Sequence, residues 1–169
     1  MAPAQEQKYI SLISAGQKEI ANGNHKAILT LLQDLHRVSD SPLLTENIDV
    51  ENVGIHDLIA SSAKIQTTLE ILGNIHALGE KAIIFCVYKE SQRMLQRIIR
   101  YKYQSTPKII NGDTKVLSTT RVRDIEANYS RQQAIDDFGA KPGFNVIIMS
   151  PIAAGMGLNV TAANHVIHF

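Results

Sequence analysis

The chain has 169 residues, of which 44% are hydrophobic, and its formal net charge is +1. This length suits one well-packed domain, and the near-neutral charge gives no overall field of the kind that marks a polyanion-binding protein. No apolar run approaches the roughly 20 residues needed to cross a bilayer, and the N-terminus lacks the pattern of a secretory signal. The single cysteine, Cys86, lies in an apolar run and excludes an internal disulfide, so we expect a core residue of an intracellular protein.

The first 78 residues are predicted to be mainly helical. Apolar residues recur at helical spacing over residues 5–20 and 25–38, which predicts two helices separated by a break at 21–24. Residues 43–58 show no clear period and are interpreted as a loop with short helical turns. A third helix is expected to start at residues 61–64 and to end at Gly79.

From residue 79 onward, predicted strands and helices alternate. Apolar runs predict strands at 82–87, 108–110, 146–149 and 166–169, and helices are expected at 91–101 and 130–138. This order predicts an α/β fold with a parallel sheet flanked by helices. We expect one domain, in which a helical lead-in of about residues 1–78 packs on an α/β core of about residues 79–169.

The loop after residues 146–149 is the most informative stretch. It begins with Ser150 and contains Gly155 and Gly157, and a short helix is expected around residues 159–163. In parallel sheets, ligands bind at the loops that follow the strands. A Gly-x-Gly after a strand is compatible both with a ligand loop and with a tight turn needed only for packing.

Several kinds of catalytic site are missing from the sequence. It contains no phosphate-binding loop of the Gly-x-x-x-x-Gly-Lys-Ser/Thr type and no cysteine cluster. His165 and His168 would point to opposite faces of a strand, which is wrong for joint metal ligation. We therefore expect no catalytic residue and no metal ligand in this chain. Its basic clusters are compatible with solvated helix faces or phosphate contacts; they comprise Arg93, Arg97, Arg100 and Lys102, and then Arg121, Arg123 and Arg131.

Residues 153–167, Ala-Ala-Gly-Met-Gly-Leu-Asn-Val-Thr-Ala-Ala-Asn-His-Val-Ile, resemble motif V of the Swi/Snf-type ATPases, which are helicase-like DNA translocases of superfamily two. Ala154 stands where the family pattern has its first glycine. Residues 79–85 are similar to motif IV, and residues 111–114 and the Arg-x-x-x-Ile-x-x-Phe pattern of 131–138 match the segments between the two motifs. Residues 115–129 are extra. The resemblance is greatest to bacterial members.

The resemblance implies the second RecA-like lobe, of P-loop NTPase type, of an ATP-dependent duplex-DNA translocase or chromatin-remodeller-like protein. ATP and Mg would be bound mainly by the first lobe, and motif VI with its arginine finger would follow residue 169. The isolated fragment is therefore expected to be inactive. Implied partners are double-stranded DNA, the first RecA-like lobe and another DNA-bound protein such as RNA polymerase. The expected location is the cytoplasm, in association with the nucleoid, with no membrane contact.

The same resemblance assigns two sets of site residues. The residues expected to line the ATP cleft between the lobes are Gly155, Gly157 and Asn159. The residues expected to face the tracked DNA strand are Ser150, Asn111, Gly112, Thr114 and Arg131, the last being either structural or phosphate-facing. The alternative function is a stand-alone, non-catalytic α/β binding or protein-interaction module, which the missing phosphate loop and arginine finger favour.

Overall fold

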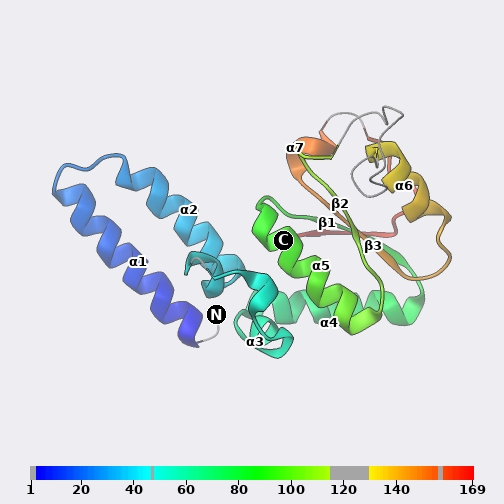
Figure 1. Ribbon diagram of the computed structural model, residues 1–169, viewed down its shortest axis with the longest axis horizontal. Helices are drawn as coiled ribbons and strands as arrows, with labels where there is room; N and C mark the ends of the chain where they lie inside the picture. The colour runs from blue at the N-terminus through cyan, green and yellow to red at the C-terminus, as the bar shows by residue number, and fades with distance from the viewer. Residues whose placement is uncertain (1–2, 47, 115–129, 156–157) are drawn as a thin grey trace. The chain divides into compact units, whose positions relative to one another are not determined.

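The computed structural model describes residues 3–46, 48–114, 130–155 and 158–169 (Figure 1). The described chain divides into two compact units, residues 1–69 and 70–169. The long helix α4 (Ala63–Leu78) contributes residues to both. No helix in the described ranges has the length and hydropathy required of a membrane span.

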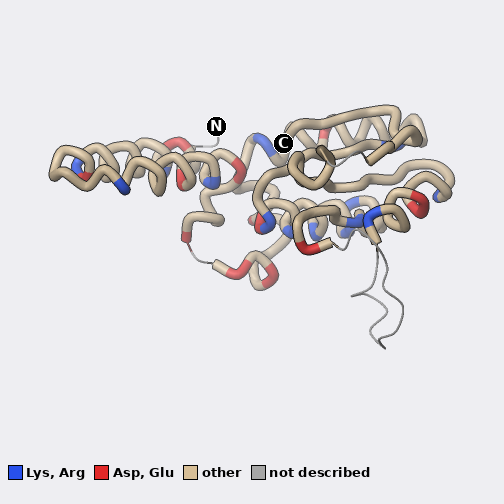
Figure 2. Tube along the Cα trace, turned by 90° about the horizontal axis from the view of Figure 1, so that it is seen from above, with Lys and Arg blue, Asp and Glu red and all other residues tan. Residues whose placement is uncertain are grey.

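A helical hairpin forms most of the first unit. Helix α1 (Pro3–Ala21) and helix α2 (Ala27–Asp40) confirm the two predicted helices. Gly23 has φ +86° in the connection, a conformation that glycine adopts readily. The two helices approach closely at Gly16, where an added Cβ would lie 2.5 Å from a methyl of Leu31. Acidic and basic positions are mixed along this hairpin (Figure 2).

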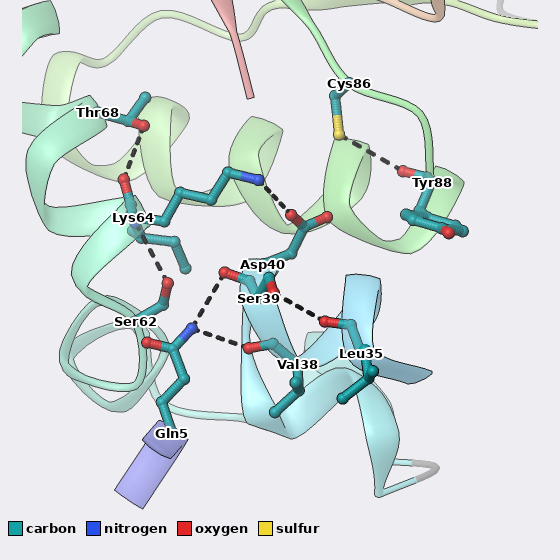
Figure 3. Close-up of polar contacts among 11 residues, drawn as sticks. Gln5, Leu35, Val38, Ser39, Asp40, Ser62, Lys64, Thr68, Cys86 and Tyr88 are labelled. Carbon is teal, nitrogen blue, oxygen red and sulfur yellow. Dashed lines mark hydrogen bonds and ion pairs between the residues drawn. The ribbon is translucent and has the colours of Figure 1, made fainter. Parts of the chain in front are cut away.

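Three short helices follow the hairpin, as expected for residues 43–58. They are η1 (Pro42–Thr45), η2 (Val50–Asn52) and α3 (Ile55–Ala60). Buried polar contacts secure the end of α2 (Figure 3). The Gln5 amide donates to the carbonyls of Val38 at 2.8 Å and Ser39 at 3.0 Å. Lys64 Nζ lies 2.6 Å from Asp40 Oδ1, so α1, α2 and the start of α4 are joined by hydrogen bonds and charge.

A four-stranded parallel sheet organises the second unit. Its strands are β1 (Lys81–Phe85), β2 (Lys108–Ile110), β3 (Asn145–Met149) and β4 (His165–His168). Their order in the sheet is β2-β3-β1-β4, and every pair is parallel. The predicted parallel α/β fold is therefore confirmed.

Helix α5 (Lys89–Tyr103) and helix α6 (Arg131–Ala140) cover opposite faces of this sheet (Figure 1). The two crossovers run in opposite directions across the strand order, and right-handed connections then place their helices on opposite faces. One face packs alternate strand residues against α6. The residues of this core are Ile83, Ile110, Ala134, Ile135, Phe138, Ile147, Met149 and Ala153.

The prediction of a short helix around residues 159–163 is wrong. Residues 158–164 are irregular, with a turn at 161–162 and a bend at 164, and the helix that follows β3 is α7 (Pro151–Ala154). It begins there because the Ser150 hydroxyl accepts a hydrogen bond from the amide of Ala153 at 3.1 Å. Pro151 is in the first helical turn, where a backbone N–H has no acceptor within the helix. Proline has no N–H, so no hydrogen bond is lost at this position.

Candidate functional site

The carboxyl ends of β1, β2 and β3 lie at one edge of the sheet, because the strands are parallel. Backbone hydrogen bonds continue past the strand ends and hold the following loops together. The Cys86 amide donates to the Met149 carbonyl at 2.9 Å, and the Ser150 amide donates to the Ile110 carbonyl at 2.8 Å. The loops predicted to carry the site residues are thus joined at their bases.

The turn of residues 111–114 is shaped by its own side chains. Asn111 Oδ1 accepts a hydrogen bond from the Asp113 amide at 2.9 Å, and the hydroxyl of Thr114 accepts one from the Asn111 amide at 3.1 Å. Gly112 is exposed at this turn, and a Cβ added to it would meet no atom within 4 Å. The polar side chains therefore fix the turn, and the backbone of Gly112 is left accessible to a ligand.

Gln92, in the first turns of α5, connects this turn to the end of β1. It has no exposed surface. Its Nε2 donates to the Cys86 carbonyl at 2.8 Å, and its Oε1 accepts from Asn111 Nδ2 at 2.9 Å. This residue was not predicted from the sequence. The signal that could have found it is its spacing, which places a polar residue on the same, apolar helix face as Leu95 and Ile99.

Arg131 holds the same turn from α6. Only 7% of the residue is exposed. Its Nε donates to the Thr114 carbonyl at 3.0 Å, and its Nη2 donates to the Asn111 carbonyl at 3.3 Å. A capping box between Ser130 and Gln133 starts the helix at this residue, close to the start predicted at residue 130. These contacts are those of a structural residue; a phosphate contact by Arg131 stays a prediction.

A charged pair connects the turn to the start of α5. Lys89 Nζ lies 2.7 Å from Asp113 Oδ1, and both side chains are exposed. An exposed pair of this kind contributes little to stability. It does place a cation beside Gly112, and no sequence pattern indicated that Lys89 and Asp113 would meet.

The loop after β3 carries the residues predicted for the ATP cleft. Gly155 is exposed and ends α7 with φ −62° and ψ −5°, a conformation open to any residue. Asn159 is exposed as well. Gly157 lies outside the described residues. The Ser150 hydroxyl, predicted to face DNA, is engaged in capping α7, and the residue is 9% exposed.

Strand β4 is aligned on β1 at both of its ends. The Asn164 amide donates to the Lys81 carbonyl at 2.9 Å, while the Asn164 side chain accepts from the Lys81 amide at 3.1 Å. At the other end, the Phe85 and His168 rings stack with centroids 5.4 Å apart. Within the described part of the chain, no three His, Cys, Asp or Glu side chains are grouped to hold a metal ion.

Relatives in two bacteria match most or all of the chain. The Zorya protein ZorD of Escherichia coli O139:H28 is 38% identical over 172 residues, which cover 100% of this chain and 15% of that protein. The putative ATP-dependent helicase/translocase YwqA of Bacillus subtilis is 28% identical over 142 residues, which cover 84% of this chain and 14% of that protein. The chain thus spans about one seventh of the length of these relatives.

Solved structures of a Sulfolobus solfataricus SWI2/SNF2 ATPase share the fold. Its C-terminal domain matches with a TM-score of 0.77 and 23% identity, over 99% of this chain and 67% of that one. Its ATPase core in complex with double-stranded DNA matches with the same TM-score and 22% identity, over 99% of this chain and 32% of that one. Residues 63–169 match the model of the helicase conserved C-terminal domain. The chain therefore belongs to the helicase conserved C-terminal domain family and is a C-terminal helicase lobe with the RecA-like fold of the Swi2/Snf2 ATPases.

Proposed function

We propose that this chain is the second motor lobe of an ATP-dependent translocase that moves on duplex DNA. The observation that carries the proposal is the joining of the 111–114 turn and the Ser150–Gly155 loop at one sheet edge, in a chain of the helicase C-terminal domain family. Two comparisons support it: the Bacillus relative is described as a putative ATP-dependent helicase/translocase, and the SWI2/SNF2 core was solved with double-stranded DNA. Such a motor would work in the bacterial cytoplasm, on nucleoid DNA.

The 111–114 turn would contact the DNA backbone. The side chains of Asn111 and Thr114 are engaged by Gln92, Asp113 and Ile109, so the exposed backbone around Gly112 would approach a phosphate. Arg131 would act through the turn, and Ser150 through the position of α7. Contacts to phosphates carry no sequence information, which suits a protein that tracks along DNA of any sequence.

The loop after β3 would face the nucleotide. Gly155, Gly157 and Asn159 would line a cleft completed by the first lobe, which would hold most of the ATP and Mg. Gly155 and Asn159 are exposed, as contact with a nucleotide requires. Bound ATP would supply the free energy of hydrolysis. The lobe alone lacks the phosphate-binding loop, so we expect it to be inactive by itself.

A short covalent and hydrogen-bonded path joins the two sides of this edge. The amide of Ser150, at the start of the loop after β3, donates to the carbonyl of Ile110, which precedes the 111–114 turn. A shift of the loop would therefore displace the base of the turn. Packed elements that switch between discrete positions can convert a change of bound nucleotide into movement of a loop or a domain.

The test is ATP hydrolysis by the full-length protein, with and without duplex DNA, beside the isolated lobe. We expect DNA-stimulated hydrolysis by the full-length protein and none by the lobe. Gly112→Asp should reduce the stimulation, because a carboxylate at the turn would repel phosphate. Gln17→Asp adds the same charge on the exposed surface of α1 and should leave the stimulation unchanged.

Two outcomes would contradict the proposal. A full-length protein without DNA-stimulated hydrolysis would contradict the DNA motor, and one without any ATP hydrolysis would favour the non-catalytic binding module. Equal stimulation in Gly112→Asp and Gln17→Asp would remove the turn from the DNA interface.

A further inference from the structure

Helix α5 carries a row of four basic residues at spacings of four, four and three. They are Lys89, Arg93, Arg97 and Arg100. Residues so spaced share one face of a helix. The opposite face buries Met94, Leu95, Ile98 and Ile99 against the sheet. Arg93 and Arg100 are exposed and Arg97 is half-buried, so this basic row is on the outward face of α5.

The basic row begins at the turn proposed to contact DNA. Lys89 Nζ is 2.7 Å from Asp113 Oδ1, next to the exposed Gly112. From there to Arg100, the helix rises by about 16 Å, at about 1.5 Å per residue. One strand of duplex DNA presents a phosphate about every 3.4 Å along the axis. The basic row therefore has the length of about five nucleotides.

The small net charge of the chain conceals a segregation of charge between its two units. Residues 70–169 contain 12 basic and 8 acidic residues, whereas residues 1–69 contain 5 basic and 8 acidic residues. In α5 itself, Glu90 is the only acidic residue, and it lies in the first turn beside the row. The unit that carries the DNA turn is thus the cationic one.

We propose that the basic row of α5 is a second contact surface for the phosphates of duplex DNA, continuous with the 111–114 turn. This inference rests on the proposed function, in which the protein engages duplex DNA. Three of the four residues are arginines, whose planar guanidinium groups suit phosphate oxygens. The row has the charge and spacing for the backbone and no aromatic or amide side chains for reading bases, so its contribution is independent of DNA sequence.

The test compares the salt dependence of DNA binding in matched variants of the full-length protein, using a fluorescein-labelled duplex and fluorescence anisotropy. R93Q/R100Q removes two charges from the row. K18Q/K26Q removes two charges from exposed positions of the first unit. R93K/R100K retains the charge. All four substituted positions are exposed, so the fold should be retained, as unchanged circular dichroism and thermal melting would verify.

We expect R93Q/R100Q to bind more weakly and to reduce the slope of log affinity against log salt by about 2, because each phosphate contact contributes about 0.9. The ratio of wild-type to variant affinity should then fall about tenfold between 50 and 200 mM salt. K18Q/K26Q should keep the wild-type slope, and R93K/R100K should keep most of it. Duplexes of unrelated sequence should behave alike.

A wild-type slope in R93Q/R100Q would overturn the inference. So would an equal loss in R93K/R100K and R93Q/R100Q, since the effect would then not follow charge. Both results require a wild-type protein that binds duplex DNA. A wild-type protein without duplex binding would instead contradict the proposed function.

Discussion

The side-chain amide of Asn111 donates a 2.9 Å hydrogen bond to Oε1 of Gln92, a residue with no exposed surface. The other end of the Gln92 amide donates to the carbonyl of Cys86. A single side chain thus fixes the distance between the ends of β1 and β2, at the edge proposed to meet DNA. Both polar groups would lose their partner if Gln92 were apolar.

Gln92→Leu should therefore destabilise the fold by about 1–3 kcal/mol, because the Cys86 carbonyl and the Asn111 amide would be left without their partner. Urea unfolding of the full-length protein, followed by fluorescence or circular dichroism, measures the change. Gln132→Leu is the control, since Gln132 is exposed on α6 and donates a hydrogen bond to Asp136 of the same helix. Equal free energies of unfolding in the two variants would contradict a structural role for Gln92.

Arg131→Lys should loosen the 111–114 turn. A lysine has one charged group in place of the guanidinium fork and cannot donate to the carbonyls of both Thr114 and Asn111 in the same geometry. Hydrogen exchange at residues 111–114 should become faster, with a loss of about 1–3 kcal/mol in the free energy of unfolding. Arg93→Lys, at an exposed position of α5, should change neither. Unchanged exchange in Arg131→Lys would assign Arg131 a role other than holding the turn.

Asp40→Ala should destabilise the first unit more than Asp34→Ala. The Asp40 side chain is 8% exposed and its Oδ1 lies 2.6 Å from Lys64 Nζ, whereas Asp34 forms a more exposed pair with Arg37 at 3.6 Å. Lys64 remains partly solvated, so we expect a cost of about 2 kcal/mol for Asp40→Ala and under about 0.5 kcal/mol for Asp34→Ala. Thermal melting of both variants measures the difference, and equal melting temperatures would show that the buried pair contributes no more than the exposed one.

Tyr103→Phe should reduce the amount by which the free energy of unfolding falls at alkaline pH. Burial raises the pKa of Tyr103 above its ordinary value of 10.0. Above pH 10 the unfolded state therefore binds fewer protons than the folded state, and the free energy of unfolding falls as pH rises. Urea unfolding at pH 8 and at pH 10.5 should show a smaller fall in Tyr103→Phe than in the wild type. Tyr101→Phe, on the exposed side of the same helix, should keep the wild-type fall.

Sequence patterns predicted the sheet well because its central strands, β1 and β3, are short apolar runs buried on both faces. All five residues of β3 are buried, so no alternation was needed to detect it. The start of α6 was predicted because it depends on local sequence: the capping box joins Ser130 to Gln133, only three residues later. In contrast, α7 was missed because Ser150 and Pro151 were interpreted only as part of a ligand loop, although serine followed by proline is a helix-start pattern.

The contacts that shape the candidate site were beyond sequence reasoning. Gln92 meets Asn111 from 19 residues away, and Arg131 reaches the Thr114 carbonyl from 17 residues away. Such pairs depend on how α5 and α6 pack on the sheet, which local patterns do not encode. The assignments of Gly155 and Asn159 to the nucleotide, and of the 111–114 turn to DNA, remain predictions from family resemblance.

The position of β1 between β3 and β4 has a consequence for synthesis. Lys81 aligns with Asn145, 64 residues later, and Ala82 aligns with His165, 83 residues later. At a translation rate of about 5–20 residues per second, β1 is synthesised roughly 3–13 s before the first of its two neighbours. During that interval both of its edges are open, so the nascent chain is most exposed to aggregation and chaperone binding at the strand that later becomes one of the most enclosed in the lobe.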